Sequence, residues 1–128
     1  MQESKLVAEI MSNQIKSVTE DTTVIDAVKM MASFDIGSVV ILDGKEQPVG
    51  IFSERDLLKR VVGLEKNLTI PIKEVMTSKM VCINENDSIE AAVSVFMDST
   101  FRHLPVVNNK QRVTGMVSLR DILDYVYK

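Results

Sequence analysis

The stretch Gly50-Ile51-Phe52-Ser53-Glu54-Arg55-Asp56 returns 65 residues later as Gly115-Met116-Val117-Ser118-Leu119-Arg120-Asp121. Working outward from it, residues 7–61 align with residues 72–126 without a gap, and twelve of the aligned pairs are identical. Similarity at one fixed offset indicates an internal structural repeat. The sequence therefore predicts one module over residues 1–128, made of a first motif at 7–62, a linker at 63–71 and a second motif at 72–128.

The two motifs have the same predicted order of secondary structure. In the first, residues 15–18 form a short strand, and Thr23 caps a helix whose apolar residues recur at helical spacing, at positions 24, 27, 28 and 31. Residues 38–42 and 49–52 form a hairpin, and a final helix starts at Ser53 and runs to about residue 62. The second copy turns its hairpin at 108–110, and its final helix starts at Ser118 and runs to about residue 127. The order is β-α-β-β-α twice, which predicts a mixed α+β fold.

A motif of this size is too small to be stable alone, because a chain of about 60 residues buries only about 60% of its unfolded surface. We therefore expect the two motifs to pack together with pseudo-two-fold symmetry. Clefts between packed units are favoured positions for small ligands.

Composition excludes several classes of protein. There are 15 Lys and Arg against 18 Asp and Glu, giving a net charge of −3 without any long block of like charge, which argues against nucleic-acid binding. Cys82 is the only cysteine and His103 the only histidine, so neither a disulfide nor a Cys/His metal site is expected. No apolar run approaches the roughly 18 residues of a membrane span. These features favour a cytoplasmic protein.

Two interpretations of the repeated stretch stay open. Ser-x-x-Asp is a capping-box pattern, in which the hydroxyl and the carboxylate only bond to the backbone at the start of a helix. Alternatively, free N–H groups at a helix start favour an anion, and a carboxylate there accepts both hydroxyls of a ribose. Capping alone requires neither the glycine three residues upstream nor the arginine before the aspartate. The second interpretation predicts a nucleotide site.

The two Gly-x-x-Ser-x-x-Asp blocks, the strand at 101–107 (Phe-Arg-His-Leu-Pro-Val-Val) and the leading segments at 9–11 and 74–76 together resemble the CBS-domain family. The whole chain is similar to a tandem CBS pair, often called a Bateman module. The resemblance implies a regulatory, energy-sensing module that binds AMP, ADP or ATP between its motifs. It implies no enzyme activity and no required cofactor, and the sequence shows no catalytic constellation or Walker loop.

The resemblance also assigns residues to two clefts. In the family, the aspartate of each block holds the ribose hydroxyls, and the Ser or Thr contacts the ribose or phosphate. Cleft A then comprises Gly50, Ser53 and Asp56, with Met80, Val81 and Cys82 against the base and Arg102 and His103 near the phosphates. Cleft B comprises Gly115, Ser118 and Asp121, with Ile15, Lys16, Ser17, Gly37 and Ser38. Further candidate contacts are Arg55, Arg120 and Pro105.

The clefts are not equivalent in sequence. Only cleft A has two cationic candidates at its phosphate end, so we expect it to bind a phosphorylated ligand more tightly. Cleft B has Val40 where the second copy has Pro105, which leaves two options: an empty cleft or an uncharged adenosine compound. His103 is as consistent with a local hydrogen-bonding role as with ligand contact, and Cys82 is better explained as a small packing residue than as a reactive thiol.

The expected partners follow from the resemblance as well. The chain carries no effector domain of its own, so the regulated partner is expected to be another protein, and a homodimer through helical faces is expected. Two alternatives stay open: a structural dimerisation module without ligand, and a binder of S-adenosylmethionine or NAD.

Overall fold

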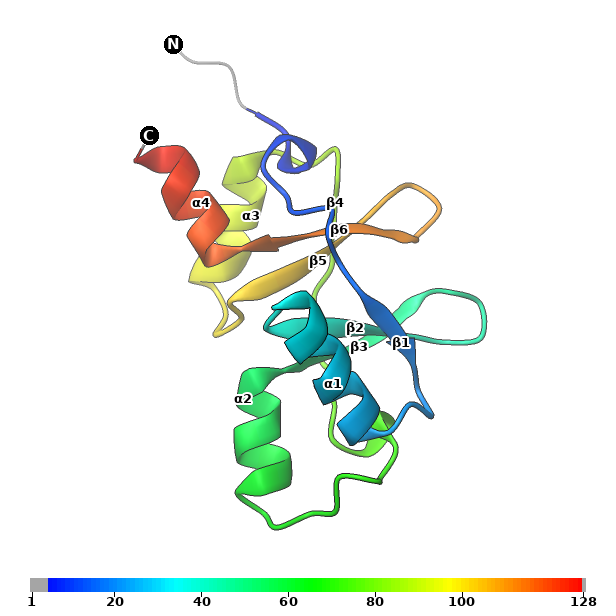
Figure 1. The fold of residues 1–128 in the computed structure, drawn as a ribbon. Helices are drawn as coiled ribbons and strands as arrows, with labels where there is room; N and C mark the ends of the chain where they lie inside the picture. Colours follow the sequence, from blue (N-terminus) through cyan, green and yellow to red (C-terminus); the bar gives the residue numbers. More distant parts are fainter. Residues whose placement is uncertain (1–4, 128) are drawn as a thin grey trace. The chain divides into compact units, whose positions relative to one another are not determined.

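The computed structural model describes residues 5–127; residues 1–4 and 128 of the predicted module lie outside that range (Figure 1). The chain divides into two compact units. We call Lys16–Met80 the central unit, and residues 5–15 with 81–127 the terminal unit. Each unit is treated by itself below.

The predicted element order is confirmed in both units. In the central unit it is β1 (Ser17–Thr19), α1 (Val24–Phe34), β2 (Ser38–Leu42), β3 (Pro48–Ser53), α2 (Glu54–Asp56), η2 (Leu57–Val62) and η3 (Ile72–Glu74). In the terminal unit it is η1 (Val7–Glu9), β4 (Ile83–Asn84), α3 (Ile89–Met97), β5 (His103–Val107), β6 (Val113–Ser118) and α4 (Leu119–Val126). Each unit holds a three-stranded mixed sheet, in the orders β1-β2-β3 and β4-β5-β6. The fold is mixed α+β, as predicted.

The first helix of each unit begins where the sequence predicts. The Thr23 hydroxyl accepts a hydrogen bond from the Asp26 N–H at 3.3 Å, and the Ser88 hydroxyl accepts one from Ala91 at 3.1 Å. Helix α1 ends at Asp35, whose φ of 53° puts it in the left-handed conformation that stops helices. The apolar spacing therefore buries one face of each helix against its own sheet.

The hairpins use the same turn chemistry in both units. In the central unit, Asp43 Oδ1 accepts hydrogen bonds from the Lys45 N–H at 2.8 Å and the Gln47 N–H at 3.0 Å. In the terminal unit, Asn108 Oδ1 accepts the equivalent bonds from Lys110 and Arg112. A side chain that bonds to the backbone two residues on stabilises a tight turn. This turn fixes the antiparallel register of β2 with β3 and of β5 with β6.

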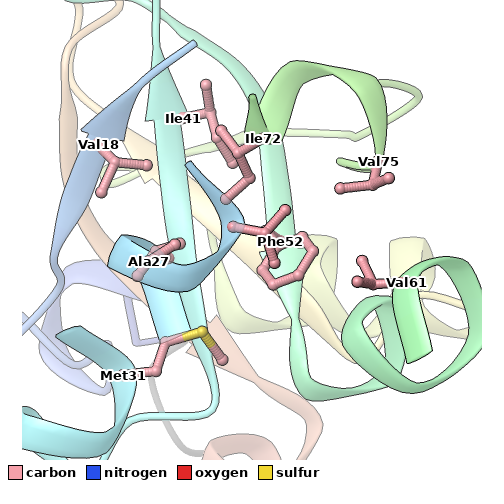
Figure 2. Close-up of a cluster of buried hydrophobic side chains, with 10 residues drawn as sticks. Val18, Ala27, Met31, Ile41, Phe52, Val61, Ile72 and Val75 are labelled. Atoms are coloured by element: carbon pink, nitrogen blue, oxygen red, sulfur yellow. The ribbon is translucent and has the colours of Figure 1, made fainter. Parts of the chain in front are cut away.

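The leading segments of the two sequence copies are exchanged between the units. Ile72 and Val75, from the second copy, are buried in the core of the central unit, close to Phe52 and Val61 (Figure 2). Val7, from the first copy, is fully buried in the core of the terminal unit. Backbone hydrogen bonds secure both segments, from Ile72 N–H to Thr22 O at 2.7 Å and from Val7 N–H to Asp87 O at 2.8 Å. Compact units and sequence repeats therefore have different boundaries.

The closing helix of the central unit departs from the prediction of one regular helix up to residue 62. After the single turn of α2, the chain continues as the π-helix η2. The Gly63 N–H donates to Leu58 O at 2.8 Å, five residues back. A Cβ on residue 63 would lie 2.7 Å from that same oxygen, so glycine permits the wide turn. In the terminal unit α4 stays α-helical and ends at Val126.

Candidate ligand-binding site

Both Ser-x-x-Asp blocks form capping boxes. Ser53 and Ser118 are the N-cap residues of α2 and α4, and both have extended backbone. The Ser53 N–H donates to Asp56 Oδ2 at 2.9 Å, and the Ser118 N–H donates to Asp121 Oδ2 at 2.8 Å. In return, each serine hydroxyl accepts from the aspartate N–H, at 3.3 Å and 3.1 Å. The capping interpretation is thus realised in both blocks, and it leaves open whether the carboxylates also bind a ligand.

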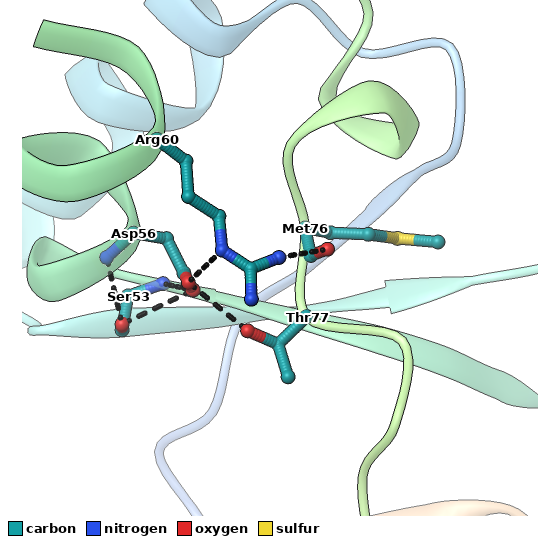
Figure 3. A network of polar contacts seen from close by, with 5 residues as sticks. All are labelled: Ser53, Asp56, Arg60, Met76 and Thr77. Carbon is teal, nitrogen blue, oxygen red and sulfur yellow. Dashed lines mark hydrogen bonds and ion pairs between the residues drawn. The ribbon is translucent and has the colours of Figure 1, made fainter. Parts of the chain in front are cut away.

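The Asp56 carboxylate takes part in a wider network (Figure 3). Its Oδ1 atom accepts a hydrogen bond from the Thr77 hydroxyl at 3.0 Å and forms an ion pair with Arg60 Nε at 3.5 Å. A second nitrogen of Arg60 donates to Met76 O at 3.1 Å. Asp56 itself is only 7% exposed. Buried carboxylates are held by such partners because an unpaired buried charge is costly.

The Asp121 carboxylate has fewer partners, although the backbone around it is equivalent. Ser12 takes the place of Thr77 in the repeat and pairs with Met116 as Thr77 pairs with Ile51. The Ser12 hydroxyl, however, accepts from the Gln14 N–H. Tyr125 takes the place of Arg60, and its ring lies under the Lys5 ammonium. Within residues 5–127, the Asp121 carboxylate is bonded by the Ser118 N–H alone.

The two block glycines make room for methionine side chains. A Cβ on Gly50 would collide with the sulfur of Met76, and a Cβ on Gly115 would lie 2.5 Å from the sulfur of Met11. Both glycines are buried. Within each unit, a methionine side chain thus comes close to the backbone of the block glycine. Met11 and Met76 are themselves an identical pair of the repeat, and this pairing is the signal that sequence reasoning missed.

The pairing of strands places other candidates beside the capped helix starts. His103 pairs with Ser118 across β5 and β6, and the Leu119 N–H donates to Arg102 O at 3.0 Å. In the central unit, Ser38 pairs with Ser53, and the Glu54 N–H donates to Gly37 O at 3.0 Å. Arg102 and His103 therefore lie at the start of α4, and Gly37 and Ser38 lie at the start of α2.

The remaining candidates differ in exposure. Arg55 and Arg120 are exposed on the first turns of α2 and α4, whereas Pro105 is fully buried in β5. Lys16 lies over the Phe34 ring, 4.1 Å from its centroid, and Ser17 is exposed on β1. Three candidates that lie between η3 and β4 are at least partly accessible: Met80, Val81 and Cys82. Ile15, just before β1, is also partly accessible. Burial raises the pKa of the Cys82 thiol, which agrees with a packing role.

Clefts A and B each combine residues of the central unit with residues of the terminal unit. Because each unit is described by itself, the existence of both clefts stays a prediction. Across residues 5–127, no three His, Cys, Asp or Glu side chains are grouped to hold a metal ion. Over the same residues, no helix is both long and apolar enough to cross a membrane.

Comparison with known proteins identifies the family. The CBS domain model matches residues 7–63 and again residues 72–128. Since these two matches cover most of the sequence, the chain belongs to the CBS-domain family. The repeat of Gly-x-x-Ser-x-x-Asp is the part of the sequence that pointed to it.

Two curated relatives are similar to this chain over different shares of their own length. An uncharacterised 17.7 kDa protein of Acidianus ambivalens is 28% identical over 116 residues, covering 91% of this chain and 70% of that protein. The inosine-5′-monophosphate dehydrogenase of Methanocaldococcus jannaschii is 30% identical over 123 residues, covering 96% of this chain. The second match spans only 24% of the dehydrogenase, so the similarity is confined to one part of that enzyme.

Solved structures show the same fold. A CBS domain protein of unknown function from Thermoplasma acidophilum superposes with a TM-score of 0.86 at 29% identity, covering 96% of this chain and 70% of the other. A CBS domain protein from Pyrobaculum aerophilum, solved as a complex with AMP, superposes with a TM-score of 0.84 at 25% identity. That match covers 91% of this chain and 89% of the other.

Proposed function

We propose that this chain is a regulatory module that binds an adenosine-containing ligand, with AMP, ADP or ATP as the adenine nucleotides expected. The observation that carries the proposal is the pair of capped Ser-x-x-Asp helix starts in a CBS pair. The AMP complex of the Pyrobaculum aerophilum protein supports it. In this proposal, clefts A and B hold the ligand, and the Asp56 and Asp121 carboxylates accept the ribose hydroxyls.

The ligand regulates by favouring one arrangement of the protein over another. A ligand shifts such an equilibrium only if it binds the two states with different affinities. In this proposal the regulated target is another protein. This module supplies the sensing step, and the partner supplies the response.

A homodimer belongs to the same proposal. Apolar side chains are exposed along the closing helices of both units: Leu58 at 65%, Val62 at 57%, Leu123 at 48% and Val126 at 57%. Apolar side chains gathered along a helix favour burial against another molecule. A second copy of this chain is the proposed occupant.

The test is titration of the purified chain with AMP, ADP, ATP, adenosine, NAD and S-adenosylmethionine, with GMP as control. Calorimetry gives affinity, thermal unfolding gives stabilisation by mass action, and sedimentation gives the assembly state. We expect AMP or another adenine nucleotide to raise the unfolding temperature while GMP does not. Failure of every adenosine compound at millimolar concentration would contradict the proposal and favour a purely structural dimerisation module.

A phosphate role for Arg102 is tested on the same samples. Arg102→Ala should weaken AMP binding more than adenosine binding, because charge-assisted hydrogen bonds are the stronger ones. Equal losses for the two ligands would contradict it.

A further inference from the structure

We infer that Thr77 and Arg60 close the Asp56 carboxylate to ligand, so that the Asp121 carboxylate is the one that takes a ribose first. The inference rests on the proposed function and names the residues that make its two sites unequal. From the charges of Arg102 and His103 alone, cleft A, which contains Asp56, is expected to bind the ligand more tightly. The inference reverses that order of affinities.

The first step counts hydrogen-bond acceptor positions. An ionised carboxylate offers about four lone-pair positions. At Asp56, Oδ2 accepts from the Ser53 N–H and the Ser53 hydroxyl, and Oδ1 accepts from Thr77 and faces Arg60 Nε. All of these positions have a protein partner. The two hydroxyls of a ribose find no acceptor at Asp56 until Thr77 and Arg60 are displaced.

The second step concerns how firmly those partners are held. The Thr77 backbone is bonded to β3 in both directions, with its N–H donating to Ile51 O at 2.8 Å and its O accepting from Ile51 N–H at 3.0 Å. Arg60 is anchored by its second bond, to Met76 O. The guanidinium is about half exposed, so screening by water weakens its ion pair, and the Thr77 hydroxyl is the stronger part of the closure.

The third step is the contrast with Asp121. Its backbone frame is the same, because Ser12 pairs with Met116 in both directions, at 2.8 Å and 2.9 Å. The side chains differ: Ser12 bonds to the Gln14 N–H, and Tyr125 stands where Arg60 stands in the other copy. In the described chain only the Ser118 N–H occupies an acceptor position of Asp121. Asp121 can therefore accept the two ribose hydroxyls without losing a hydrogen bond to any of the described residues.

The experiment is calorimetric titration of the full chain with AMP. We expect one AMP per chain to bind in the first, tighter step. Asp121→Asn should weaken the affinity of that step roughly ten- to hundredfold, which is the range for loss of a hydrogen bond to a charged group. Asp56→Asn should act on the second, weaker step, since Asp56 belongs to the other cleft. Thr77→Val, which keeps the shape and removes the hydroxyl, should strengthen the second step or make it measurable. Ser12→Ala is the matched control and should change neither step.

The outcomes separate the two proposals. If no adenosine compound binds, the proposed function fails. If AMP binds but the tighter step depends on Asp56, or two equal steps appear in the parent chain, the proposed function stands and this inference is overturned. A ligand-free check uses the double-mutant cycle of Asp56→Asn with Thr77→Val in urea unfolding. Simple additivity of the two changes would show that Thr77 does not hold Asp56.

Discussion

The closing helices of the two units start alike and continue differently. Both begin at a serine N-cap with a reciprocal aspartate, and both follow the last strand of a three-stranded sheet. After the aspartate, the central unit widens into a π-helix that carries Arg60 and ends at Gly63, whereas the terminal unit keeps a regular α-helix that carries Tyr125. The residues that are identical in the two copies thus determine where each helix begins, and aligned residues that differ between the copies determine what each carboxylate meets.

The largest effect on stability is expected at the two glycines that contact methionine side chains. The atoms around Gly115 include backbone and can move less than those around Gly50. The three atoms nearest to a Cβ on Gly50 all belong to the flexible Met76 side chain, but a Cβ on Gly115 would also lie 2.8 Å from the backbone oxygen of Ser12. We expect Gly115→Ala to lower the free energy of unfolding by about 3 kcal/mol and Gly50→Ala by about 1 kcal/mol, as overpacking does. Urea unfolding measures both.

Gly44→Ala is the control for these two variants, because nothing lies within 4 Å of its Cβ position. It should leave stability nearly unchanged. Equal losses at Gly50 and Gly115 would show that the Ser12 backbone yields as easily as a methionine side chain.

The next effect concerns the π-helix. Gly63→Ala places a methyl group 2.7 Å from Leu58 O. Because this oxygen belongs to the backbone, it cannot move away by a side-chain rotation. We expect a loss of about 2 kcal/mol in the free energy of unfolding. Hydrogen exchange should show faster exchange of the Gly63 N–H region. Unchanged stability and exchange would mean that the Leu58–Gly63 turn relaxes without cost.

A smaller effect of opposite sign is expected at Thr114. Its hydroxyl oxygen is buried without a hydrogen-bond partner among the described residues, and the first copy has Val49 at this position. Thr114→Val should therefore raise the free energy of unfolding by about 1 kcal/mol, since it removes an unsatisfied polar group. The reciprocal change Val49→Thr should lower it. A loss on Thr114→Val would indicate that water satisfies the hydroxyl.

The smallest effect is the acid dependence of one hairpin turn. Hydrogen bonds from the backbone lower the pKa of Asp43 from its ordinary value of 3.8, and the bond from the Gln47 N–H contributes more than the bond from the Lys45 N–H. A lowered folded-state pKa adds stability above that ordinary value, and this stability is lost as the pH falls through the folded-state pKa. Asp43→Asn copies the Asn108 turn and should flatten stability against pH below about pH 4.

Thermal unfolding from pH 6 to pH 2 measures the difference between Asp43→Asn and the parent chain. Asn108→Asp should introduce the same acid dependence into the other hairpin. Identical pH profiles for all three chains would contradict a contribution from this turn.

Sequence reasoning gave the element order because local signals specify it. The caps at Thr23 and Ser53, the apolar spacing of α1 and the turn at residues 43–45 all act within a few residues. What it missed depends on contacts distant in sequence. The Thr77 hydroxyl bonds to Asp56 across 21 residues, and Met11 reaches Gly115 across more than a hundred. Both the methionines and the glycines are identical pairs of the repeat, Met11/Met76 and Gly50/Gly115. Alignment alone does not show which methionine contacts which glycine.

The exchanged leading segments also bear on the order in which the chain folds during synthesis. Residues 16–80 are contiguous, so the central unit has its whole core once residue 80 has left the ribosome. The segment around Val7 is made before the central unit, yet the strands that share its core, β5 and β6, are made after the central unit. Because domains fold as units while the chain grows, the segment around Val7 is expected to wait, exposed, until β5 and β6 have left the ribosome.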